Sequence, residues 1–161
     1  MGLICDQIQE LLDALLANEE LEGARIMRAY PIQNKPHPLT RPVITLDLEK
    51  LQGEPPCLGS IVGSTGTKIF AGHSYAMFLR ISVHTPLREG GERCRRMMDS
   101  VLHGLLHTKS MVCSYRCGSL TAAKDLGAYV LSAQAEIHGV MRACVQEGMR
   151  GIRIKETEAR E

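Results

Sequence analysis

The residues that could do chemistry gather in a few short stretches. His103 and His107 lie one helical turn apart, a spacing that can hold a metal ion. The residues between them are Gly-Leu-Leu, so the glutamate of the HExxH zinc motif is absent. Two helical ligands are fewer than zinc requires, and a histidine near the C-terminus of a helix suits the helix dipole. We therefore interpret both as solvated helix-end histidines and expect no metal and no cofactor.

Cys113 and Cys117 form a second pair, four residues apart on an expected strand. They lack the spacing of a zinc knuckle or a redox motif. The six cysteines, at positions 5, 57, 94, 113, 117 and 144, are scattered through elements patterned as ordinary core. We expect reduced thiols that pack as small hydrophobic groups.

The sequence also lacks a complete phosphate-binding loop and a complete nucleophilic-serine motif. Gly59–Lys68 (GSIVGSTGTK) has the composition of a phosphate loop, but its final Gly-Thr-Lys breaks the required Gly-Lys-Ser/Thr order. The chain contains no GxSxG turn for a nucleophilic serine. Because no catalytic set is assembled, we do not expect an enzyme.

A cluster of basic residues lies at the start of the longest predicted amphipathic helix. Arg93, Arg95 and Arg96 fall in the first turns of an expected helix. They form either a solvated face or a contact between subunits with acidic side chains such as Glu136 or Asp47.

The segment 75–107 organises the elements that must position these residues. From Tyr75 to Pro86, apolar and mixed residues alternate with the period of a strand. From Gly91 to His107 the apolar residues recur at helical spacing. The predicted apolar stripe of this helix is Cys94, Met97, Met98, Val101, Leu102, Leu105 and Leu106.

The remaining chain predicts one more helix and four more strands. The helix covers 3–16, with Ile4, Ile8, Leu11, Leu12, Leu15 and Leu16 on one stripe. The strands cover 24–30, 43–51, 110–116 and 128–140. This order, α-β-β-loop or hairpin-β-α-β-β, predicts an α+β fold. We expect a mostly antiparallel mixed sheet of about four to six strands with two helices packed on one face.

The opposite sheet face is predicted to be semi-polar. Its residues are Val43, Thr45, Asp47, Phe78, Arg80, Ser82, His84, Gln134, Glu136 and His138. Such a face is either solvated or meets a protein neighbour.

The connections complete a single domain over residues 1–161. Prolines rule out a regular element in 31–42, so the strands on either side suggest a broad hairpin. Residues 52–74 are rich in Gly, Pro and Ser and are expected to project as a loop or hairpin. Residues 142–161 form a partly flexible C-terminal extension with one possible short strand, Ile152–Lys155.

Composition excludes several classes of function. With 161 residues and 44% hydrophobic composition the chain can bury a core. A net charge of +1 provides no overall attraction to nucleic acid or anionic membranes, and two Phe and no Trp leave few platforms for stacked bases. No apolar run is long enough to cross a bilayer, and Met1–Ala17 carries acidic residues that a signal peptide lacks, so we expect a cytosolic protein.

In the order of its elements and in several local sequence features, the chain resembles the tail terminator (tail completion) proteins of long-tailed bacteriophages and contractile phage-tail-like particles. The resemblance runs from about Leu3 to Val140. It rests on LLDALLANEEL, PVITLDLEKL, FLRISVHTPLREGGERCRRMMDSVLHGLL and KDLGAYVLSAQAEIHGV.

The resemblance implies a structural protein of the virion tail, assembled in the bacterial cytoplasm of a phage or prophage host. Its copies would form a ring, expected to be a hexamer, that caps the head-proximal end of the tail tube. The partners implied are other copies, the tail tube protein and the head connector or neck protein. No membrane and no specific nucleic acid are implied, although DNA could pass through the ring. The subunit or tube contacts implied are Ile61, Ser64, Thr65, Lys68, Arg93, Arg95, Arg96 and Glu136.

Two alternatives stay open from the sequence. One is another neck or head-to-tail joining protein of the same kind of particle. The other is a small metal- or thiol-dependent enzyme that uses the histidine pair or the cysteine pair.

Overall fold

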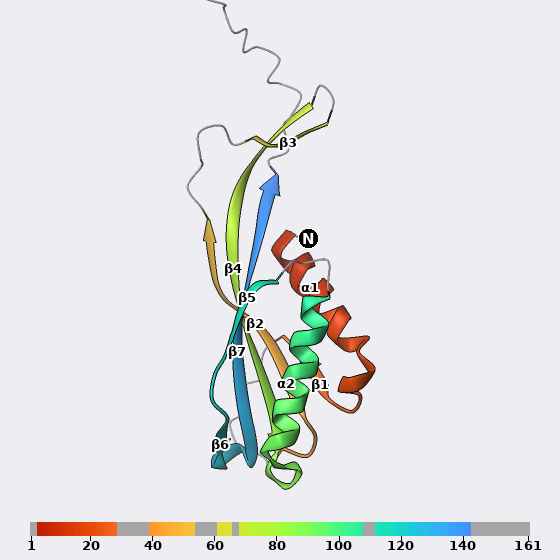
Figure 1. Ribbon diagram of the computed structural model, residues 1–161. Helices are drawn as coiled ribbons and strands as arrows, with labels where there is room; N and C mark the ends of the chain where they lie inside the picture. Colours follow the sequence, from red (N-terminus) through yellow and green to blue (C-terminus); the bar gives the residue numbers. More distant parts are fainter. Residues whose placement is uncertain (1–2, 29–38, 54–60, 66–67, 108–111, 143–161) are drawn as a thin grey trace, which may run out of the picture.

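The computed structural model describes residues 3–28, 39–53, 61–65, 68–107 and 112–142. Its two α-helices are α1 (Leu3–Leu16) and α2 (Gly90–Leu106). The strands are β1 (Arg25–Met27), β2 (Val43–Gly53), β3 (Ile61–Thr65), β4 (Lys68–Pro86), β5 (Val112–Cys117), β6 (Thr121–Ala123) and β7 (Ala128–Arg142). The predicted α+β class and order of the main elements are confirmed (Figure 1).

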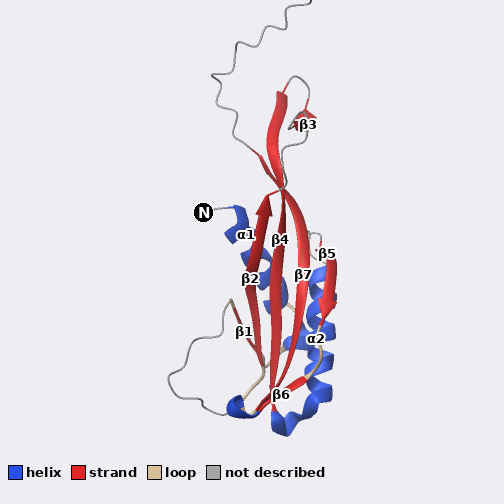
Figure 2. Cartoon of the chain, turned by 90° about the vertical axis from the view of Figure 1, so that its left-hand side faces the viewer, coloured by secondary structure: helices blue, strands red, loops and turns tan. Residues whose placement is uncertain are grey.

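Six strands form one open mixed sheet, and β3 pairs separately with the first residues of β4. The strand order is β1-β2-β4-β7-β5, and β6 pairs with β7 beyond the end of β5. Only the β1–β2 pair is parallel within the described strands. Both helices lie on the same face of the sheet, and the described part places no helix over the other face (Figure 2).

The two helices bury the stripes that their spacing predicts. Ile8, Leu11, Leu12 and Leu15 of α1, and six of the seven stripe residues of α2, are buried against the sheet. Leu16 and Leu106 are exceptions, at 62% and 49% exposed. Each is the last residue of its helix, and each is turned about 100° away from the buried residue before it.

β4 and β7 supply the centre of the core. Tyr75, Met77, Leu79, Ile81 and Val83 of β4 are all fully buried under the helices. The residues of β7 predicted to face inward, Leu131, Ala133, Ala135 and Ile137, are buried too. The alternation read from the sequence therefore gives the correct face for both strands.

The broad hairpin predicted for the first two strands is wrong. β1 and β2 are parallel neighbours, with Arg25 opposite Val43 and Met27 opposite Thr45. The backbone N–H of Arg25 donates to the carbonyl oxygen of Pro42 at 2.9 Å, so the chain returns to the start of β1 before β2 begins. The connection is long enough for the crossover that a parallel pair requires.

Two segments outside the predicted strands contain regular structure. β3 and the start of β4 lie within 52–74, and 118–127 contains β6 and a 3-10 turn over Lys124–Leu126. The predicted strand Ile152–Lys155 and the extension beyond Arg142 lie outside the described residues.

Candidate interaction surface

The sheet face opposite the helices, which we call the open face, carries a polar cluster that joins three strands. Glu49 of β2 accepts hydrogen bonds from Arg80 of β4 and, at 2.8 Å, from Nε2 of Gln134 of β7. The hydrogen bonds from Gln134 and Arg80 hold the pKa of the Glu49 carboxyl below its usual value. The Glu49 carboxyl therefore favours its charged form although it is exposed to water.

A second polar cluster lies further along β7. Glu136 accepts a hydrogen bond from Ser114 Oγ of β5 at 2.9 Å, and its other oxygen lies 2.8 Å from Nε2 of His138. The contacts with His138 and Ser114 lower the pKa of the Glu136 carboxyl. The semi-polar character predicted for this face is confirmed by the two clusters.

The other end of the open face is more buried than the sequence pattern suggests. Val43, Thr45, Ser82 and His84 lie on this face but are buried. The hydroxyls of Ser82 and Ser132 lie 2.9 Å apart, so one donates a hydrogen bond to the other. Burial lowers the pKa of His84, which favours the neutral imidazole. Val43 and Thr45 are therefore shielded from water, although the face on which they lie is semi-polar as a whole.

A two-stranded hairpin extends the sheet at one end. β3 pairs with β4 from Ile61 opposite Ala71 to Thr65 opposite Lys68. β2 pairs with β4 only as far as Tyr75, and β7 only as far as Gly72, so the start of β4 has left both of its neighbours in the main sheet. Figure 1 shows this hairpin standing clear of the body. Four predicted contact residues lie on it: Ile61, Ser64, Thr65 and Lys68.

The three arginines predicted as contacts lie on the outer side of α2. Arg93 pairs with Glu89 at 2.6 Å, while Arg95 and Arg96 share Glu92 at 3.7 and 3.6 Å. All three side chains are more than half exposed, so these pairs contribute little to stability. Because α2 and Glu136 lie on opposite sides of the sheet, an arginine–Glu136 contact would have to join two subunits. That contact stays a prediction.

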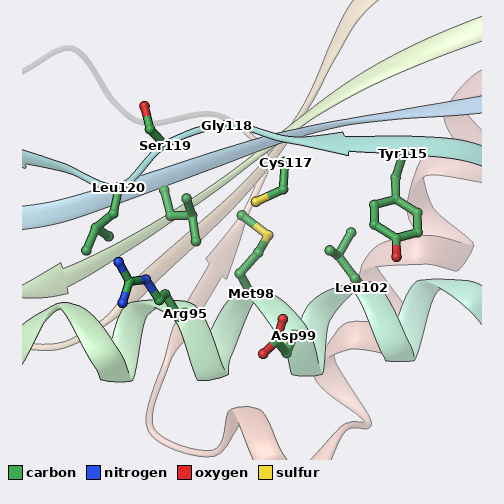
Figure 3. Close-up of a pocket in the computed structure, with 10 residues that line it drawn as sticks. Arg95, Met98, Asp99, Leu102, Tyr115, Cys117, Gly118, Ser119 and Leu120 are labelled. Atoms are coloured by element: carbon green, nitrogen blue, oxygen red, sulfur yellow. The ribbon is translucent and has the colours of Figure 1, made fainter.

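The structure adds a groove between α2 and β5 that the sequence did not indicate (Figure 3). Its volume is about 610 Å3. Tyr115 and Cys117 line one side, and the Tyr115 ring points toward α2. The groove exists because α2 packs over β4 and β7, which leaves the edge strand β5 without a helix above it.

The position of β5 corrects the interpretation of the cysteines. Cys94 is buried as predicted, but Cys5, Cys113 and Cys117 are exposed. Partial desolvation beside α2, followed by the nearby Asp99 carboxylate, raises the pKa of the Cys117 thiol. A nucleophilic cysteine requires the opposite shift, so the groove does not activate this thiol. The two remaining cysteines, at 57 and 144, lie outside the described residues.

The histidine pair stands at the end of α2. The Nε2 atoms of His103 and His107 lie 3.1 Å apart, with their rings edge to face. No group of three or more potential metal ligands occurs among the described residues. No helix in the described part of the chain is long and apolar enough to span a bilayer.

Comparisons with known proteins were made at the levels of sequence and structure. No family model matches the sequence, and no curated protein matches it. A solved structure that is similar, with a TM-score of 0.45 and 16% sequence identity, belongs to "Virion of native gene transfer agent (GTA) particle". That match covers 82% of this chain and 92% of the other.

A second similar structure is "Cryo-EM Structure of an Extracellular Contractile Injection System, PVC sheath/tube terminator in extended state". Its TM-score is 0.46 and its identity 10%, with 89% of this chain and 58% of the other covered.

Proposed function

We propose that this protein is a tail terminator. Its copies form a ring that caps the head-proximal end of a tail tube and joins it to the head connector. The ring would be part of the virion tail and would assemble in the bacterial cytoplasm. The chain acts as one domain whose segment 52–74 projects from the body.

The β3–β4 hairpin is the observation that carries the proposal. β4 continues past the last residues that pair with β2 and β7, and beyond them pairs only with β3 among the described strands. A two-stranded hairpin that stands apart from a larger sheet is only marginally stable by itself. Such a hairpin is well placed to contact another protein, and a tube end is the contact that the sequence resemblance implies.

The surfaces of the body fit a structural role. The two polar clusters on the open face are internally hydrogen-bonded, and none of their residues lines the groove between α2 and β5. A ring requires one patch of a subunit to meet a different patch on the next. The differing faces and edges of this sheet provide such patches.

Deleting residues 55–70 tests the proposal. Gly53 and Tyr75 remain opposite each other in the register of β2 and β4, so the body should keep its fold and melting temperature. Tails assembled with this variant should lack a defined end and vary in length under the electron microscope. Tails of normal length would contradict the proposal. Binding to an isolated head connector, without binding to tube ends, would instead indicate a neck protein.

A further inference from the structure

Two strands of the main sheet, β2 and β5, each have a stretch whose outer side pairs with no described strand. β1 pairs with β2 only from Val43 to Thr45, so no described strand covers the outer side of β2 from Leu46 onward. On the other side, no described strand covers the outer side of β5. Figure 2 shows β2 and β5 at opposite sides of the sheet. Open edges expose backbone donors and acceptors that can pair with another strand.

The registers place these two edges in the same cross-strand rows. Asp47 lies opposite Arg80, Arg80 opposite Gln134, and Gln134 opposite Arg116. The adjacent row runs from Leu48 to Tyr115 in the same way. The complete set of end pairs is Leu46 with Cys117, Asp47 with Arg116, Leu48 with Tyr115, Lys50 with Ser114, and Leu51 with Val112.

We propose that β2 of one copy pairs with β5 of the next copy, so that the sheets of neighbouring subunits join edge to edge. This inference rests on the proposed ring and identifies its subunit contact. It assigns that contact to the sheet edges rather than to Arg93, Arg95, Arg96 and Glu136.

The chemistry of the rows supports the pairing. Asp47 and Arg116 are both exposed, and neither has a hydrogen-bond or ion-pair partner among the described residues. They lie on the open face and carry opposite charges, which attract when two edges meet. On the helix-covered face, Leu48, Leu51 and Tyr115 are 37%, 39% and 51% exposed. Joining the edges would bring these exposed apolar side chains together.

The strand directions fit a closed ring. β2, β4, β7 and β5 alternate in direction, so β2 and β5 run in opposite directions. Rotation about an axis along the strands preserves these directions, so β2 meets the neighbouring β5 as an antiparallel strand. Below Leu46 the edge of β2 is taken by β1, which confines the pairing to the five rows.

Closing the sheet in this way also sets the orientation of the subunit. The helices add bulk to one face and fit on the convex, outer side of the ring. The open face, with its internally paired charges, then lines the inside.

Disulfide cross-linking in assembled tails tests the pairing. The variant Asp47→Cys with Arg116→Cys, made with the five cysteines other than Cys94 replaced by serine, is oxidised with diamide. Facing cysteines in adjacent strands can form a disulfide, so a ladder of covalent multimers up to the full ring is expected. The control Leu48→Cys with Arg116→Cys uses the same strands but places the thiols on opposite faces, and should give no ladder.

Charge reversal provides an independent test. Asp47→Arg and Arg116→Asp should each weaken ring formation about tenfold or more, and the double reversal should restore it. Native mass spectrometry measures the ring, and melting temperature verifies the fold of each variant. Reversing Arg93 and Arg96 to glutamate should leave the ring intact.

The outcomes separate this inference from the proposed function. A ring that resists both single reversals and gives no ladder overturns the edge pairing while the terminator role stands. A ring lost on reversal of Arg93 and Arg96 alone also overturns it and favours a contact through α2. A protein that is absent from tails and monomeric alone overturns both.

Discussion

Gly139→Ala is expected to destabilise this fold through one buried contact. Gly139 of β7 lies opposite Tyr75 of β4, and a Cβ at this position would stand 2.4 Å from the tyrosine oxygen and 2.5 Å from Cζ. Atoms cannot approach this closely, so the Tyr75 ring must move. The ring is fully buried, and its hydroxyl donates to Gln7 of α1 at 2.5 Å. A shift therefore disturbs both the core and the contact with α1.

The expected cost combines two effects. Overpacking a core costs roughly 1–3 kcal/mol, and loss of the hydrogen bond to Gln7 adds on the order of 1 kcal/mol. For a domain of this size, each kcal/mol lowers the melting temperature by about 2–4 °C. Gly139→Ala should therefore lower the melting temperature by roughly 10 °C.

Thermal unfolding at one fixed protomer concentration measures this cost, since assembly would shift the melting temperature. Gly53→Ala is the matched control, because no atom lies within 4 Å of a Cβ at that position. In a Tyr75→Leu background, adding Gly139→Ala should cost much less, because the clashing ring atoms are gone. A wild-type melting temperature for Gly139→Ala, or an equal cost in both backgrounds, would refute the reasoning.

Three further predictions concern the core, pH and the thiols. Leu11→Ala should cost about 2–5 kcal/mol in urea unfolding, whereas Leu16→Ala, at a residue 62% exposed, should cost little; equal costs would contradict the assignment of the stripe. Burial lowers the pKa of His84 from its ordinary value of 6.5. The unfolded chain therefore binds the proton more readily, and the free energy of unfolding should fall as pH drops below about 6.5. His84→Gln should flatten that slope, and an unchanged slope would exclude this origin. In a variant that retains only Cys94 and Cys117, a thiol reagent should modify Cys117 in the folded protein and Cys94 only after unfolding, because Cys94 alone of the two is buried; equally fast modification of both would contradict this.

The sequence predicts the elements well where one periodicity persists. α1 has the predicted bounds, 3–16, and α2 and β7 bury the predicted residues. In these segments the burial of one face is set within the element itself, so the local pattern is sufficient.

Sequence patterns fail where neighbours decide the outcome. Alternation shows that β5 is a strand, but it does not show that β5 stands at a sheet edge that α2 does not cover, which leaves Cys113 and Cys117 exposed. The same limit explains the parallel pairing of β1 with β2, since strand direction depends on the path of the connection. The Glu49 cluster draws on strands far apart in the chain, and the register that joins them follows from the fold alone.

The length of β4 has a mechanical consequence. Its 19 residues run without interruption from the hairpin through the centre of the sheet, a span of about 60 Å. A force that pulls on the hairpin along this strand acts in shear on the ladders that β4 forms with β2 and β7. Many hydrogen bonds then carry the load together instead of opening one at a time. The hairpin is therefore tied to the body as firmly as the sheet itself, and tension at its tip reaches the core beneath both helices.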